Sequence, residues 1–321
     1  MIWSLSAAKT FLKCQRQWYF QYCLANGRSR DSLRREAYLL SNLQSVSAWR
    51  GQLVDHIIST YLVPRLNRGI NVRVDEALDY ARFTFDKQLA SALAHTIRNG
   101  FTSRTAAGPN FAAFRAIEYS ESVSDEEVGS AWADVEKALR NFFHVDDLQA
   151  IVNTATQRIS QRALFFRMDG VSVRAVPDLL LFSDGVAPKI IDWKVSIWES
   201  HDYRLQLGLY GVAVTRCNRH RDFPDSCVDR RASEIPLFEV QLLSGEVRQH
   251  GLTDDDIYAV EHYVAETATQ IETVAAASSF REPRAEDFEA AKFPSACESC
   301  NFRKICWESG NVHVGNQSLF D

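Results

Sequence analysis

The stretch VPDLLLFSDGVAPKIIDWK, residues 176–194, contains two short apolar runs on either side of a polar segment. Branched and aromatic side chains dominate both runs, which is typical of β-strands. The Ser-Asp-Gly sequence at residues 183–185 is a turn signal, so the two runs are predicted to pair as a hairpin. We expect Asp178 to lie on the first strand and Asp192 on the second, which would bring both carboxylates to one edge of a sheet.

Lys194 follows Asp192 by two residues, and side chains two apart in a strand point to the same face. Carboxylate oxygens are the ligands that Mg²⁺ and Mn²⁺ prefer. At such a site the ion lowers the pKa of a bound water, while the lysine orients the nucleophile or stabilises developing negative charge. Taken alone, however, a Pro-Asp pair upstream of an Asp-x-Lys tripeptide is also explained by coincidence.

The remaining sequence predicts mostly helices before the hairpin and a mixture of helices and strands around and after it. The expected helices run from Ser4 or Ser6 to Leu24, with Cys14 in the middle, and over residues 45–66, 75–97, 126–143, 203–214 and 254–277. The expected strands cover residues 163–166, 171–182, 189–195 and 237–243. From Phe293 onward we expect a loop.

In the helix expected over residues 203–214, Gln206 and Tyr210 are four residues apart and project from one face. That face is expected to meet the polar residues of the preceding strand. The alternative for Tyr210 is a role as an ordinary core residue.

Three of the seven cysteines, Cys297, Cys300 and Cys306, lie near the end of the chain, and Cys14 lies near its start. An odd number of cysteines does not suit a disulfide framework, and in a reducing compartment clustered cysteines favour metal ligation. Bringing Cys14 to the others closes a loop at a cost of roughly 5 kcal/mol, which thiolate–metal bonds can offset. Zinc and an iron–sulfur cluster both accept four thiolates, and the spacing alone favours the cluster only slightly. The other three, Cys23, Cys217 and Cys227, are assigned to packing or exposed loops.

The chain has 321 residues, of which 46% are hydrophobic and 24% charged, as in an ordinary soluble protein. Its start lacks the features of a secretory signal, and no apolar run approaches a membrane span, so we expect a cytoplasmic protein. A net charge of −5 excludes coating of nucleic acid by bulk charge, so any contact must be local. Two arginine-rich stretches qualify, unless they are solvated loops: Arg28, Arg30, Arg34 and Arg35, and Arg216, Arg219, His220, Arg221, Arg230 and Arg231.

Together these residues resemble the RecB-like branch of the PD-(D/E)xK nuclease superfamily that carries a four-iron, four-sulfur cluster. Members include the AddB subunit of bacterial recombination nucleases and the CRISPR-associated adaptation exonuclease. The resemblance rests on Cys14, Gly51 with His56, Pro177-Asp178, Asp192-Trp193-Lys194, Gln206 with Tyr210, and Cys297, Cys300 and Cys306.

The resemblance implies an α/β fold: a restriction-endonuclease-like core with a mixed central sheet flanked by helices, a helical N-terminal region and insertion, and a C-terminal iron–sulfur clasp. It implies that Asp178 and Asp192 bind Mg²⁺ or Mn²⁺, that Lys194 is the catalytic lysine, and that Gln206 and Tyr210 support the site and contact DNA. The four cysteines would hold a 4Fe–4S cluster. One elaborated nuclease domain is expected over residues 1–321, with the core at 45–66 and 151–250, the insertion at 67–150, and the clasp at 1–30 and 290–310.

One departure concerns the helix metal ligand. The family places His four residues after Gly, whereas here Asp55 occupies that position and His56 follows one residue later. One residue turns a helix by about 100°. We favour His56 as the ligand, with Asp55 as the alternative oxygen ligand, and the third reading is that neither contacts metal.

The implied function is a metal-dependent DNA nuclease that acts on single strands or duplex ends, in DNA repair and recombination or in antiviral defence. It would work with a separate helicase or defence-system partner. The alternatives are a catalytically inactive scaffold that binds DNA or a helicase partner, and a redox-sensing regulator in which the cluster itself is the functional element.

Overall fold

The computed structural model describes residues 2–94, 108–196, 203–218, 220–224, 230–277 and 283–308. The chain forms two compact units. The first comprises Met1–Ser4 and Gln44–Ala265, and the second comprises Leu5–Leu43 and Glu266–Asp321. Among the described residues, no helix is both long and apolar enough to cross a membrane.

A five-stranded sheet in the order β2-β5-β6-β7-β8 forms the centre of the first unit. Its strands are β2 (Gln157–Ser160), β5 (Leu179–Phe182), β6 (Lys189–Lys194), β7 (Leu237–Gln241) and β8 (Glu246–His250). The predicted β5–β6 hairpin is confirmed as an antiparallel pair, and β6 and β7 run parallel. Every residue of β5 is buried, as expected for an interior strand covered on both faces. The edge strand β8 was not predicted.

The extended run predicted over residues 171–182 is in fact two strands in two sheets. Val171–Ala175 forms β4, which lies between β1 (Ile2–Trp3) and β3 (Leu164–Met168) in a separate three-stranded sheet. Pro177 interrupts the run, because proline has no N–H for a ladder hydrogen bond. Asp178 therefore lies one residue before β5 and not on a strand.

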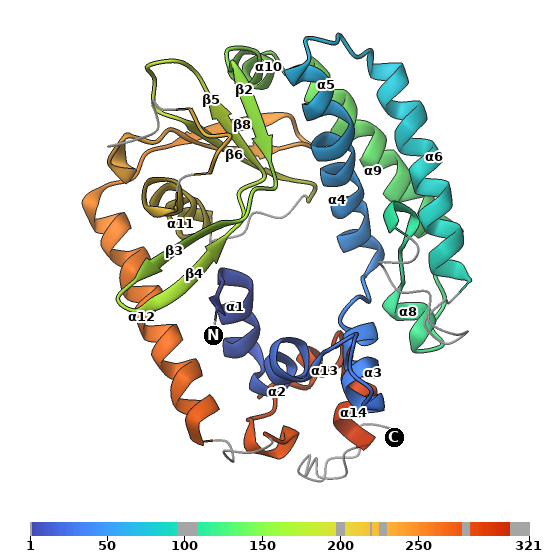
Figure 1. Cartoon of the computed structure of the whole chain (residues 1–321). Coiled ribbons are helices and arrows are strands. Elements are labelled where there is room, and N and C mark those ends of the chain that lie inside the picture. The colour runs from blue at the N-terminus through green and yellow to red at the C-terminus, as the bar shows by residue number, and fades with distance from the viewer. Residues whose placement is uncertain are drawn as a thin grey trace. The chain divides into compact units, whose positions relative to one another are not determined.

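Helices cover one face of the five-stranded sheet, and Figure 1 shows α4, α6 and α9 running side by side. The helices of this region are α4 (Val46–Ile57), a π-helical turn (Ile58–Leu62), α5 (Val63–Asn67), α6 (Val74–Leu93), α8 (Arg115–Glu118), α9 (Asp125–His144) and α10 (Asp146–Asn153). Side-chain caps fix two of the starts: Ser45 accepts from the Ala48 N–H, and Ser124 forms a capping box with Glu127. Apolar residues of α4, α6 and α9 share one core with β5, β6 and β7. The helix predicted to reach Ile97 ends at Leu93, and Ile97 itself is outside the described residues.

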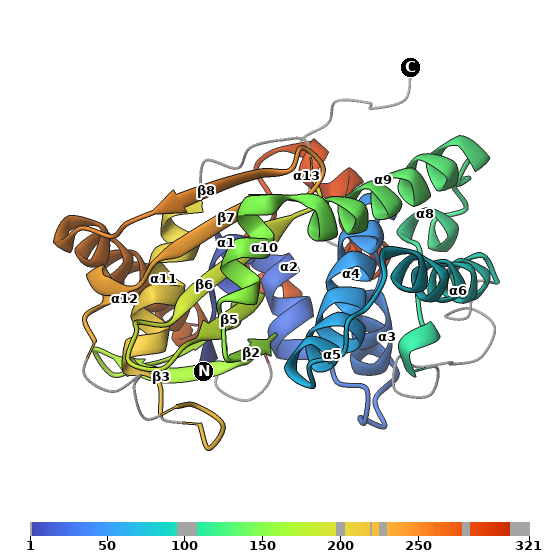
Figure 2. The same cartoon turned by 90° about the horizontal axis from the view of Figure 1, so that it is seen from above.

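Helix α11 (Tyr203–Arg216) packs against β6 of the large sheet and against β3 and β4 of the small sheet (Figures 1 and 2). Two glycines allow its other side to approach neighbouring segments closely. A Cβ atom on Gly208 would lie 2.8 Å from Val260 Cγ2 of α12 (Asp254–Ala277), and one on Gly211 would lie 2.8 Å from Leu252 Cδ1. Close packing on both sides fixes which face of α11 points toward β6.

In the second unit the predicted helix from Ser4 or Ser6 to Leu24 is broken at Cys14. It consists of α1 (Leu5–Lys13), α2 (Gln15–Trp18) and a π-helical turn (Tyr19–Leu24). Cys14 is extended, with φ −164° and ψ 111°, and caps α2 by accepting from the Gln17 N–H. The prediction that Cys14 lies inside a helix is wrong, because this residue makes the bend.

The rest of the second unit is also helical. It contains α3 (Ser32–Leu40), which was not predicted, α13 (Pro294–Glu298) and α14 (Arg303–Glu308). The segment expected as a loop from Phe293 therefore forms two short helices. Aromatic rings hold the distant parts of this unit together: Phe20 stacks on Phe302, and Tyr19 stacks on Phe288, with centroids 5.7 and 4.7 Å apart. Short 3₁₀ turns at Gly108–Asn110, Ala232–Glu234 and Ala285–Asp287 complete the described elements.

Candidate functional site

Asp178 and Asp192 lie together beside the β5–β6 hairpin. Trp193 donates its backbone N–H to Asp178 Oδ2 at 3.0 Å, which ties the start of β5 to the middle of β6. Asp192 is 1% exposed. The hairpin thus brings the two predicted carboxylates together, although only Asp192 is on a strand.

Three donors surround the Asp192 carboxylate. Lys194 Nζ lies 2.7 Å from Oδ2, as the alternation along β6 predicts. Tyr203 donates its hydroxyl to the same oxygen at 3.0 Å, and Gln206 Nε2 donates to Oδ1 at 2.9 Å. Gln206 also donates to the Tyr210 hydroxyl at 2.8 Å. Tyr203, Gln206 and Tyr210 form one stripe of α11 because they are spaced three and four residues apart.

A third carboxylate, Asp55, reaches the same place from α4. Gln161 Nε2 donates to Asp55 Oδ1 at 2.7 Å and to Asp178 Oδ1 at 3.0 Å, so a single amide bridges the two carboxylates. Gln161 lies between β2 and β3 with a positive φ of 50°, a conformation that few non-glycine residues adopt. We call Asp55, Asp178 and Asp192 the acidic centre.

Burial and repulsion by neighbouring carboxylates destabilise the charged forms of Asp55 and Asp178. Burial raises the pKa of Asp178 well above its ordinary value, and the charges of Asp192 and Asp55 raise it further. Burial likewise raises the pKa of Asp55 to about 6, although the hydrogen bond from Gln161 opposes this. The hydroxyls of Tyr203 and Tyr210 stay protonated, because burial and then the Asp192 charge raise the pKa of both. Three carboxylates facing one ammonium form an environment that a cation would stabilise.

His56 of α4 lines a cavity together with Gln52, Asp55 and Ser59. Its Nε2 is 3.5 Å from Thr60 Oγ1. Asp55, the neighbouring residue, shares a hydrogen-bond partner with Asp178. These contacts connect Asp55 to the other predicted ligands, and the role of His56 stays a prediction.

The donor set of the acidic centre suits a hard divalent cation, because it consists of carboxylate oxygens. Within the part of the chain that the structure describes, no three His, Cys, Asp or Glu side chains are arranged closely enough to hold a metal ion as they stand. The carboxylates are hydrogen-bonded to Lys194, Tyr203, Gln206 and Gln161.

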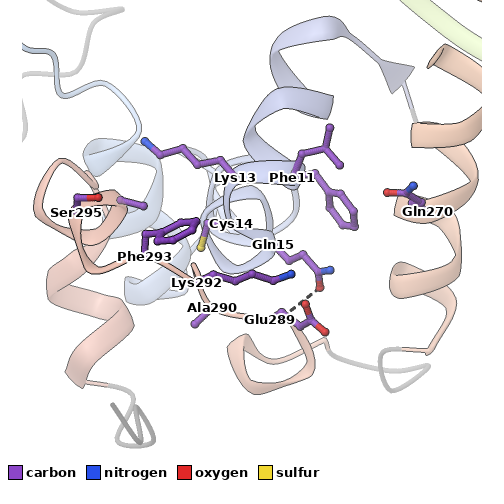
Figure 3. A pocket seen from close by; sticks show the side chains of 12 residues that line it. Phe11, Lys13, Cys14, Gln15, Gln270, Glu289, Ala290, Lys292, Phe293 and Ser295 are labelled. Atoms are coloured by element: carbon purple, nitrogen blue, oxygen red, sulfur yellow. Dashed lines mark hydrogen bonds between the residues drawn. The ribbon is translucent and has the colours of Figure 1, made fainter. Parts of the chain in front are cut away.

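All four predicted cysteines line one cavity of the second unit. Cys14, Cys297, Cys300 and Cys306 share its wall with Phe20 and Phe302. Burial raises the pKa of the Cys300 thiol to about 11, and the neighbouring Cys14 and Cys306 add to the rise. Two backbone N–H groups donate to sulfur at 3.4 Å, from Gln17 to Cys14 and from Phe302 to Cys300. Figure 3 shows a second cavity that Cys14 also lines, together with Lys13, Gln15 and Phe293.

The structure describes two of the other cysteines and most of the arginine stretches. Cys23 is exposed and Cys217 is half-buried, while Cys227 and Arg219 are outside the described residues. Several of the arginines have protein partners: Arg216 pairs with Glu261, Arg231 with Glu234, and Arg230 donates to the Gly185 carbonyl.

A model of the PD-(D/E)XK nuclease superfamily matches residues 2–307. The chain belongs to this superfamily. The α/β fold with a mixed sheet flanked by helices agrees with this assignment. No curated protein matches the chain.

Solved structures similar to this superfamily member share little sequence with it. A candidate exonuclease from Eubacterium rectale is 12% identical, with a TM-score of 0.37 and coverage of 90% of this chain and 96% of its own. The protein SSO0001 is 11% identical, with a TM-score of 0.26 and coverage of 60% and 77%. Protein VC1899 from Vibrio cholerae is 11% identical, with a TM-score of 0.24 and coverage of 72% and 61%.

Two residues that are hydrogen-bonded to the acidic centre were not predicted from the sequence. Gln161 stands in a loop between strands and has no motif of its own. Tyr203 could have been found, because it precedes Gln206 by three residues and so shares the helix face that the Gln206–Tyr210 spacing defines. The superfamily assignment covers both residues but gives neither of them a role.

Proposed function

We propose that the protein is a DNA nuclease that hydrolyses phosphodiester bonds with Mg²⁺ or Mn²⁺. The observation that supports this most is the buried contact between Asp192 and Lys194 beside Asp178. Buried carboxylates next to an ammonium are expected where a cation and a phosphate are bound. A bound divalent ion would polarise the phosphodiester and lower the pKa of an attacking water.

Each residue has a defined part in this proposal. Asp178 and Asp192 would hold the ion, with Asp55 as the ligand from α4, since it shares Gln161 with Asp178. Lys194 would orient the nucleophilic water or stabilise the negative charge that develops on the phosphate. Gln206 and Tyr210 would fix the Asp192 carboxylate and contact the DNA strand.

The test is cleavage of end-labelled single- and double-stranded DNA in the presence of Mn²⁺. Asp192→Ala is expected to lower the rate by about 100-fold or more, because it removes a metal ligand and the partner of Lys194. Asp184→Ala is the matched control, since Asp184 is exposed at the turn of the same hairpin. Equal cleavage by wild type and Asp192→Ala would contradict the proposal.

The alternative of a catalytically inactive scaffold differs in its need for metal. A nuclease binds Mn²⁺ at the acidic centre, so titration calorimetry should show binding in the wild type and its loss in Asp192→Ala. A scaffold would bind DNA without binding Mn²⁺ at these carboxylates.

We further propose that Cys14, Cys297, Cys300 and Cys306 hold a 4Fe–4S cluster. Their shared cavity, their number and the N–H donors to two of the sulfurs support this, because cluster thiolates are commonly stabilised in this way. Anaerobically purified protein should show broad visible absorbance and contain iron and sulfide. Cys300→Ser should lose the absorbance, and Cys217→Ser, the control, should retain it. A single bound zinc would overturn this assignment.

The resemblance to recombination subunits and CRISPR adaptation nucleases suggests DNA repair or antiviral defence as the setting, with a helicase or defence-system protein as partner. Affinity purification of tagged wild-type and Asp192→Ala protein from the source cells, followed by mass spectrometry, tests this. Recovery of a helicase or defence-system protein with both would support it.

A further inference from the structure

The polar face of α4 lines a cavity of about 330 Å³ that begins at the acidic centre. We infer that this cavity holds one unpaired nucleobase of the strand that is cut. The inference rests on the proposed nuclease function and adds to it a binding site for one base of the substrate strand next to the cleavage point.

The cavity is built on one stripe of a helix. Gln52, Asp55, His56 and Ser59 all line it, and their spacing of three and four residues places them on one face of α4. The opposite face carries buried residues of the core, among them Leu53 and Ile57. The polar stripe is therefore not needed for packing, and it faces the cavity.

The facing wall is held in place before any ligand arrives. Trp49 Nε1 donates to Gln88 Oε1 at 2.6 Å, and Gln88 Nε2 donates to the Pro109 carbonyl at 2.7 Å. The backbone of Gln44 is bonded on both sides, to Ala113 and Arg115. A wall fixed by such bonds loses little freedom when a ligand binds.

The chemistry of the lining fits a neutral ligand with hydrogen-bonding edges. Its described residues include three amides, a hydroxyl and an imidazole, from Gln44, Gln52, Gln88, Ser59 and His56, and they include no lysine or arginine. Among these described residues Asp55 is the one carboxylate, and it disfavours a phosphate beside it. Nucleobases present donor and acceptor edges that glutamine side chains match.

Asp55 connects the cavity to the acidic centre. It lines the cavity and shares Gln161 with Asp178, so a base in the cavity belongs to a nucleotide next to the phosphate at the acidic centre. The volume lies at the lower end of small-molecule sites, and only a base removed from its pair exposes its edge there. His56 in this arrangement contacts the substrate.

The experiment compares Gln52→Ala and His56→Ala with Gln249→Ala. Gln52 is exposed, so its loss should leave the fold intact, and Gln249 is an exposed glutamine of β8 that serves as the matched control. Metal-free binding of 2′-deoxynucleosides, which carry no phosphate, is measured by NMR titration. Both cavity variants should bind about tenfold more weakly than the wild type, and the control should bind equally well.

A second measurement separates this inference from the proposed function. Bis(p-nitrophenyl) phosphate has a phosphodiester but no base, so Gln52→Ala should cleave it with Mn²⁺ at the wild-type rate while its KM for single-stranded DNA rises. If the wild type cleaves neither substrate, the nuclease proposal fails, and nucleoside binding still tests the inference about the cavity. Unchanged nucleoside binding in both variants, or loss of Mn²⁺ binding in Gln52→Ala, would overturn the inference.

Discussion

Asp192 Oδ2 accepts from two donors at once, the Lys194 ammonium and the Tyr203 hydroxyl. If Lys194 turns toward a phosphate, the Tyr203 hydroxyl can keep the carboxylate in place. We therefore predict that Tyr203→Phe lowers kcat about tenfold with little change in the KM for DNA, as is common when a residue that orients a metal ligand is lost. Tyr258→Phe, at an exposed position of α12, should have no effect. A change confined to KM would count against an orienting role.

The raised pKa of Asp55 predicts a stability that depends on pH in the metal-free protein. Its folded pKa of about 6 exceeds the ordinary value of 3.8, so its contribution is fully present below about pH 4 and is lost as the pH rises through about 6. Asp55→Asn has no carboxyl group to ionise, so this variant does not lose stability at position 55 as the pH rises. We expect the metal-free variant to be more stable than the wild type by about 1 kcal/mol at about pH 8, and equally stable at about pH 4.

Urea unfolding followed by circular dichroism at the two pH values measures this difference. Mn²⁺ should reverse the order at the higher pH, because the wild type keeps one more ligand for the ion. A variant that is no more stable at either pH would show that Asp55 is not held in an unfavourable charged state.

At the element scale, alanine substitutions of two helix glycines are predicted to change the stability of the protein in opposite directions. A Cβ atom on Gly208 would approach the buried Val260 to 2.8 Å, so Gly208→Ala forces α11 and α12 apart. A Cβ atom on Gly51 of α4 would meet no atom within 4 Å. We expect Gly208→Ala to destabilise the protein by about 1 kcal/mol and Gly51→Ala to stabilise it by roughly 0.5–1 kcal/mol, since alanine favours helix.

Calorimetry on the two glycine variants should show shifts of the melting temperature in opposite directions. The activity of Gly208→Ala is informative as well, because α11 carries Tyr203, Gln206 and Tyr210. If both variants are more stable than the wild type, the contact between α11 and α12 is looser than the structure has it.

The sequence predicted those helices and strands whose formation depends on local patterns of residues. The hairpin of β5 and β6 was predicted because two apolar runs enclose a turn signal. The break between β4 and β5 was missed: Ala175 and Leu179 are both strand residues, and only the pairing of β4 with β3 shows that they lie in different sheets.

For the whole molecule, the proposed cluster predicts that iron removal loosens the helices of the second unit and leaves the sheet of the first unit unchanged. Cys14 and Cys300 lie far apart in the chain but within one unit, whose distant segments are also joined by the Phe20–Phe302 and Tyr19–Phe288 ring pairs. Chelation of the iron should therefore speed amide hydrogen exchange in α2 and α14 by about tenfold or more, while the amides of β6 stay protected. Rapid exchange in β6 after chelation would show instead that the cluster also supports the nuclease sheet.

The residue types and their spacing were sufficient to indicate the superfamily, the hairpin with Asp192 and Lys194, and the helix face of Gln206 and Tyr210. The last two follow from periods of two and three to four residues, which are local properties of a chain, whereas the superfamily was indicated by the resemblance of the motifs. Only the folded chain shows that Gln161 bridges Asp55 and Asp178, which brings a residue of α4 to the start of β5. The reason is physical: a one-residue shift turns a helix position by about 100°, and the face that meets a distant loop is decided by packing of the whole unit.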